Sequence, residues 1–64
     1  MGSKLKELRK QKGVSQKVVA NAIGVTTSAY SNYEQDLREP SIQVIKSLCK
    51  YFEVSADYMI GLND

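Results

Sequence analysis

Four short polar side chains share one face of a predicted helix near the middle of the chain. They are Thr27, Ser28, Ser31 and Asn32, within the stretch GVTTSAYSNYEQ at residues 24–35. Exposed helix faces usually carry Glu, Lys, Arg or Gln, because short hydroxyl and amide side chains compete with the backbone hydrogen bonds of the helix. The face offers uncharged donors and acceptors to a partner that the spacing alone does not name.

The other face of the same helix is suited to packing. Tyr30 and Tyr33 lie three residues apart, and Ala29 and Glu34 fall on the same side. We predict that this side contacts the rest of the molecule, which directs the four polar side chains outward.

Glycine and proline separate the remaining elements. Gly13, Gly24, the segment 36–40 and Gly61 divide the chain into short apolar-periodic pieces, and none of these pieces alternates as a strand would. We therefore predict an all-α fold, a compact five-helix bundle forming a single domain over residues 1–64. The predicted helices run over 4–12, 16–23 and 27–35, then from Pro40 and Ser41 to Phe52, and over a short piece after Ser55.

Helix ends and core positions follow from residue type. Hydroxyl residues stand where helix N-caps are needed, at Ser3, Ser15, Thr26 and Ser55. Gly13 and Gly24 stand just past the first two helices, where a left-handed residue is favoured. The predicted core comprises Leu5, Leu8, Val19, Ala20 and Ile23, followed by the stripe Ile42, Ile45, Leu48, Cys49 and Phe52.

Composition limits the functions open to these 64 residues. The apolar fraction of 42% and the charged fraction of 25% are ordinary for a globular domain. Because the chain has one cysteine, Cys49, and no histidine, we expect no internal disulfide and no metal site. Cys49 lies on the apolar face of the predicted fourth helix, so we interpret its thiol as part of the core rather than as a redox or nucleophilic group. We also expect no enzymatic activity and no cofactor, since no phosphate loop and no convergent carboxylates are visible.

Basic residues gather at the N-terminal end, although the formal net charge is only +2. Glu7 is the one acidic residue within the segment that holds Lys4, Lys6, Arg9, Lys10, Lys12 and Lys17. This asymmetry weakly indicates a polyanionic partner, because basic solvated helix faces are common. Neither a signal peptide nor an apolar membrane span is visible, so a cytoplasmic location without a membrane partner is expected.

The second and third helices are joined by the short sequence IGVT, which contains Gly24. So tight a link favours a steep crossing angle over an antiparallel hairpin, which is the helix-turn-helix arrangement. The segments LRKQKGVSQKVVANAIGVTTSAYSNYEQ, REPS and VSADYMIG follow one another in this order. Together they closely resemble the phage repressor and Cro-like helix-turn-helix family, also called the xenobiotic-response-element type. The resemblance implies a lambda-repressor-like fold, in which helix 27–35 is the recognition helix in the DNA major groove.

The resemblance also implies roles for individual residues. Base contacts are expected from Thr27, Ser28, Ser31 and Asn32, and Asn32 is the strongest candidate because a carboxamide can pair bidentately with adenine. Alternatively, Ser31 contacts a phosphate instead of a base. Phosphate contacts are expected from Gln16, Lys17, Arg38 and Ser41, together with backbone amides at the start of the fourth helix.

Two further features concern the end of the third helix. Arg9 and Glu34 resemble the structural ion pair that, in the family, ties the first helix to the recognition helix. Asp36 stands where the family usually has glycine, and Asp adopts the left-handed conformation less easily. We therefore expect a loop of different shape from Gln35 to Glu39.

The leading hypothesis is a sequence-specific transcriptional regulator, a repressor that binds a palindromic operator in double-stranded DNA as a homodimer. The C-terminal residues Tyr58, Ile60 and Leu62 either supply the dimer contact or complete the core. The alternative is an antitoxin-like or adaptor module whose main partner is another protein. The resemblance implies a bacterial or phage-type protein associated with the nucleoid.

Overall fold

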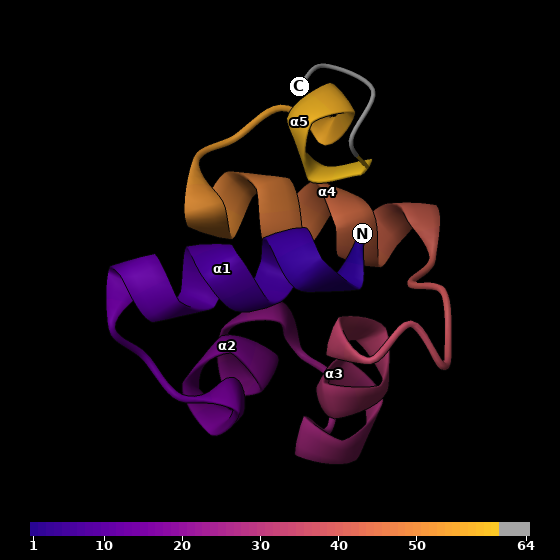
Figure 1. Cartoon of the computed structure of the whole chain (residues 1–64). Coiled ribbons are helices and arrows are strands. Elements are labelled where there is room, and N and C mark those ends of the chain that lie inside the picture. The colour runs from indigo at the N-terminus through magenta and orange to yellow at the C-terminus, as the bar shows by residue number, and fades with distance from the viewer. Residues whose placement is uncertain (61–64) are drawn as a thin grey trace.

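Five helices make up most of residues 1–60, the part of the chain that the computed structural model describes (Figure 1). They are α1 (Gly2–Lys12), α2 (Gln16–Ile23), α3 (Thr27–Glu34), α4 (Ile42–Phe52) and α5 (Ala56–Ile60). In the view of Figure 1, α1 crosses the middle of the molecule, with α2 and α3 below it and α4 and α5 above it. Over these residues the predicted all-α, five-helix fold is confirmed.

Helices α1 to α4 each end with a left-handed residue and the same pair of backbone hydrogen bonds. At Gly13 and Gly24 the predicted left-handed conformation is confirmed, with φ of 74° and 77°. Asp36 and Glu53 adopt the same conformation, with φ of 58° and 57°. After α3, the Leu37 N–H donates to the carbonyl of Asn32 at 3.0 Å, and the Asp36 N–H donates to that of Tyr33 at 3.3 Å. This is the Schellman arrangement, so Asp36 closes α3 as a glycine would.

Hydroxyl caps open the last four helices. Ser15, Thr26 and Ser55 cap α2, α3 and α5 as predicted, each accepting the N–H of the residue three positions later. Ser41 caps α4 by accepting the Val44 N–H at 3.2 Å. The predicted Ser3 cap is wrong, because α1 begins at Gly2 and has no side-chain cap. The Gly2 N–H donates instead to Asp36 Oδ1 at 3.0 Å, so a tertiary contact fixes where this helix begins.

All five helices contribute to the core. Its buried apolar residues are Leu5, Val19, Ala20, Tyr30, Tyr33, Leu48 and Met59. Leu8, Ile23, Cys49 and Phe52 are partly buried against this cluster, and burial raises the pKa of the Cys49 thiol. The prediction that Ile42 belongs to the core is wrong, since its side chain is 73% exposed. It is the first residue of α4, and the buried stripe of that helix begins further along.

Candidate nucleic-acid interface

The outward face of α3 carries the four polar side chains singled out from the sequence. Thr27 and Ser28 are exposed in the first turn, while Ser31 and Asn32 are half-buried in the second. Among residues 1–60, the side chains of Thr27, Ser28 and Asn32 make no hydrogen bond within the chain. Their donors and acceptors are therefore available to a partner.

The fourth side chain, Ser31, is already engaged within the helix. Gln35 Nε2 lies 2.9 Å from Ser31 Oγ and 3.3 Å from the Ser31 backbone oxygen. Sequence reasoning gave Gln35 no role, although its spacing of four residues from Ser31 places the two side chains next to each other on a helix. The outward face thus has three open groups and one that is held.

The opposite face of α3 is fastened to α1 and α2 through one buried carboxylate. Arg9 Nε donates to Glu34 Oε2 at 2.6 Å, and Arg9 Nη2 donates to Glu34 Oε1 at 3.3 Å. Gln16 Nε2 also donates to Glu34 Oε1, at 3.0 Å. The Glu34 side chain is only 3% exposed, so this is a buried, bidentate pair supported by a third donor. Arg9 Nη1 in addition donates to the Val14 carbonyl in the turn between α1 and α2, at 3.0 Å.

Burial and these hydrogen bonds shift the pKa values of the groups that join α3 to α1 and α2. Burial alone would raise the pKa of the Glu34 carboxyl, but the hydrogen bonds from Arg9 and Gln16 outweigh it and lower that pKa. The bond to Glu34 raises the pKa of the Arg9 guanidinium. Burial also raises the pKa of the Tyr30 phenol. The Tyr30 hydroxyl lies within electrostatic reach of Arg9 and Glu34, yet among the described residues it makes no hydrogen bond of standard geometry.

A second contact between α1 and α3 was not expected from the sequence. Gly2 is buried against the C-terminal end of α3, where a Cβ atom would fall 2.3 Å from the Glu34 backbone oxygen. Only a residue without a side chain fits this approach. Asp36, whose carboxylate accepts the Gly2 N–H, completes the contact from the loop.

The residues expected to contact phosphates lie on three different elements. Lys17 on α2, Arg38 in the loop and Ser41 at the start of α4 are all exposed. Gln16 is half-buried, and one of its amide protons is directed at Glu34. The other amide proton remains available to an acceptor, because a carboxamide nitrogen carries two.

Two of the N-terminal lysines face the other side of the bundle. The Lys4 ammonium lies 4.5 Å from the ring centroid of Tyr58, and that of Lys12 lies 5.0 Å from the ring centroid of Tyr51. These cation–π contacts join α1 to α5 and α4, away from α3. The basic character of the N-terminal sequence is therefore not concentrated on the α3 side.

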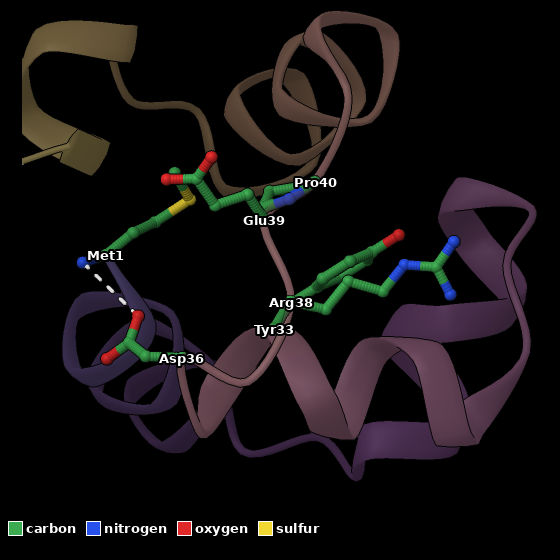
Figure 2. Close-up of a pocket in the computed structure, with 6 residues that line it drawn as sticks. All are labelled: Met1, Tyr33, Asp36, Arg38, Glu39 and Pro40. Carbon is green, nitrogen blue, oxygen red and sulfur yellow. Dashed lines mark ion pairs between the residues drawn. The ribbon is translucent and has the colours of Figure 1, made fainter.

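A cavity lies beside the end of α3, but it is small. Its volume is about 180 Å³, and it is lined by Met1, Tyr33, Asp36, Arg38, Glu39 and Pro40 (Figure 2). Small-molecule sites commonly have about 300 to 1,000 Å³. Figure 2 shows the Met1 ammonium paired with Asp36 Oδ1 at 3.8 Å, while Arg38 extends away from Asp36 and Glu39 and does not join this pair.

Within residues 1–60, no group of three or more His, Cys, Asp or Glu side chains is arranged to hold a metal ion. None of the described helices is long and apolar enough to cross a membrane. Of the residues expected at a dimer contact, Tyr58 is half-buried and Ile60 is 42% exposed, whereas Leu62 lies outside the described residues.

Helices α2 and α3, packed closely across the Gly24 turn with α3 at the surface, define a helix-turn-helix protein. Residues 5–59 match the family model described as Helix-turn-helix, and the chain belongs to this family. The recognised resemblance and the fold class are thus confirmed.

Individual relatives agree with this assignment. The HTH-type transcriptional regulator ImmR of Bacillus subtilis is 34% identical over 64 residues, which are 100% of this chain and 50% of ImmR. The cryptic phage CTXphi transcriptional repressor RstR of Vibrio cholerae is 35% identical over 52 residues, covering 81% of this chain and 47% of RstR. The chain therefore spans about half the length of these relatives.

A solved structure of similar fold is that of the P22 c2 repressor protein in complex with a synthetic operator. It superposes with a TM-score of 0.87 at 28% identity, covering 91% of this chain and 88% of that one. Its fold matches the five-helix arrangement described above.

Proposed function

We propose that residues 1–64 form the DNA-binding domain of a transcriptional repressor that recognises a specific sequence in double-stranded DNA. In this proposal α3 lies in the major groove, and Thr27, Ser28, Ser31 and Asn32 contact base edges. Lys17, Arg38, Ser41 and the free amide proton of Gln16 contact phosphates. No step requires a metal, a cofactor or catalysis, and the setting is cytoplasmic, at the nucleoid.

The observation that carries this proposal is the division of α3 into a fastened face and an open one. Glu34, Tyr30 and Tyr33 hold the helix against the bundle. On the other side, the side chains of Thr27, Ser28 and Asn32 make no hydrogen bond to any part of the chain between residues 1 and 60. Short side chains allow the helix backbone to approach the base edges closely, which long charged chains would prevent. The P22 c2 repressor–operator complex, a structure of the same fold, supports this reading.

We further propose that two copies bind a palindromic operator, with half-sites about 34 Å apart along the duplex, one helical turn. A single module of this size makes few base contacts, and pairing doubles them. Of the two described candidates, Ile60 is the more accessible, because it is 42% exposed whereas the Tyr58 ring is half-buried and contacts the Lys4 ammonium. A duplex with one half-site should bind one chain, and a duplex with two half-sites should bind two. Ile60→Asp should reduce the cooperativity with which the second chain binds to the second half-site.

The decisive experiment is selection of bound sites from random duplexes, followed by titration of the selected duplex at several salt concentrations. We expect one enriched sequence and a linear fall of log affinity with log salt, whose slope reports the number of phosphate contacts. Lys17→Ala should weaken binding to all duplexes about equally and reduce that slope by about one. Equal affinity for every duplex, or no binding at low salt, would contradict the proposal and favour a module whose main partner is a protein.

A further inference from the structure

The bond between Gln35 and Ser31 has a direction that the geometry fixes. Gln35 Nε2 lies 3.3 Å from the Ser31 backbone oxygen, which can only accept a hydrogen bond. The atom in this position must therefore be the amide nitrogen and not the amide oxygen. The same nitrogen lies 2.9 Å from Ser31 Oγ, so the hydroxyl oxygen accepts a hydrogen bond from Gln35.

This direction determines which hydrogen-bonding capacity of the Ser31 hydroxyl remains unused. One of its lone pairs is occupied by the Gln35 amide, and its proton cannot point at that same donor. Among residues 1–60 the Ser31 proton has no acceptor of its own. A hydroxyl that accepts a hydrogen bond is also polarised into a better donor. Ser31 is thus prepared to donate outward.

We propose that Gln35 is a positioning residue that makes Ser31 a hydrogen-bond donor toward the major groove, and thereby sets the base preference at one position of the operator. This inference rests on the proposed function. Cytosine is the one base that presents no acceptor in the major groove, since it shows only its N4 amino group there. Ser31 should accordingly reject cytosine at the position it reads, and accept guanine, thymine or adenine, each of which presents an acceptor there.

The test reverses the direction of the bond. Gln35→Glu replaces the amide donor by a carboxylate, which accepts the Ser31 proton and leaves only lone pairs facing the groove. Ser31→Ala, analysed by the same site selection, first identifies the position that Ser31 reads. At that position we expect the wild type to disfavour cytosine by about threefold to tenfold, the range of one net hydrogen bond, and Gln35→Glu to abolish this discrimination.

A matched control separates this effect from the added charge. Gln11→Glu makes the same chemical change on α1, where the Gln11 amide donates to Glu7 at 3.4 Å across the same four-residue spacing. It should leave the base preferences unchanged at every position. Both glutamines are exposed, so melting temperatures are expected to stay close to that of the wild type.

Each other outcome overturns a particular step. If Ser31→Ala weakens all duplexes equally, Ser31 contacts a phosphate, and the inference fails while the proposed function stands. If the position is identified but cytosine is preferred there, or Gln35→Glu leaves the discrimination intact, Gln35 does not set the donor direction. If the wild type selects no sequence at all, the proposed function itself fails.

Discussion

The two faces of α3 differ in how many of their polar groups are used within the chain. On the inner face the Glu34 carboxylate accepts three hydrogen bonds from two other helices. On the outer face Thr27, Ser28 and Asn32 make none with their side chains among the described residues. The Glu34 carboxylate on the inner face is thus fully engaged within the chain, whereas three polar side chains on the outer face are open.

This contrast separates stability from recognition. A buried carboxylate that lost its partners would be strongly unfavourable, so the inner face must keep its geometry. The outer side chains are satisfied by water when no partner is bound, so replacing them should change binding and leave folding almost unchanged. Variants that act on only one face test this separation.

The largest effect is expected from breaking the inner face. Arg9→Ala leaves Glu34 buried with only Gln16 as a partner, and should lower the free energy of unfolding by about 3 to 5 kcal/mol. Chemical denaturation measures this loss. Lys10→Ala, a neighbouring exposed cation on the same helix, is the matched control and should change stability by less than about 0.5 kcal/mol. Equal, small losses for both variants would show that the pair does not hold α3.

The close approach at Gly2 gives the next effect. Ala normally stabilises a helix relative to Gly by up to about 1 kcal/mol. Here the added Cβ would fall 2.3 Å from the Glu34 oxygen, so Gly2→Ala should instead lower stability, by about 1 to 3 kcal/mol. Ser3→Ala, one residue further and exposed, serves as the control in thermal unfolding. A stabilised Gly2→Ala variant would mean that α1 and α3 do not meet at this point.

The outer face is tested by Asn32→Ala. Binding to the selected duplex should weaken by about 1 to 3 kcal/mol, and the preference at one base pair should relax, because a bidentate pair with adenine is lost. The melting temperature should hardly change. Should affinity and preference both survive, Asn32 is not a base-reading residue, and if stability falls instead, the two faces are not independent.

Acid should weaken the inner face selectively. The pKa of Glu34 is lowered in the folded state, so the carboxylate contributes stability that is present above its unfolded pKa of about 4.3 and is lost as pH falls through the folded value. In Glu34→Gln this contribution is missing at every pH. The difference in melting temperature between wild type and Glu34→Gln should therefore shrink as pH falls below about 4. A constant difference would show that the pKa is not lowered by folding.

The smallest effect is expected at the Tyr30 hydroxyl. Because this buried group lacks a hydrogen bond of standard geometry, Tyr30→Phe should be neutral or slightly stabilising, within about 1 kcal/mol. Leu48→Ala, a truncation in the same core, should by comparison cost about 2 to 5 kcal/mol in denaturation experiments. A clear loss in Tyr30→Phe would indicate that the hydroxyl does bind the Glu34 carboxylate.

Much of the fold could be predicted because its signals are local. The caps at Ser15 and Thr26 and the left-handed glycines at 13 and 24 act through neighbouring backbone groups, so residue type is sufficient. The failures were positions where a distant segment decides. Ser3 does not cap α1, because the helix begins at Gly2, whose N–H donates to Asp36. Ile42 continues the apolar spacing of α4, but it is the first residue of that helix and is exposed, because the buried residues of α4 lie further along it. Asp36 itself closes α3 in the conformation of a glycine, a result that a propensity argument disfavoured.

The sequence by itself determined the helices, their capped ends and the polar outer face of α3, since these depend on periodicity and on backbone hydrogen bonds within a few residues. Only the tertiary structure decided that the Gln16 amide joins Arg9 in binding the Glu34 carboxylate, and that Gly2 meets the end of α3. The physical reason is that a side chain can satisfy its hydrogen bonds in several ways. Packing, and not residue type, selects which of them is used.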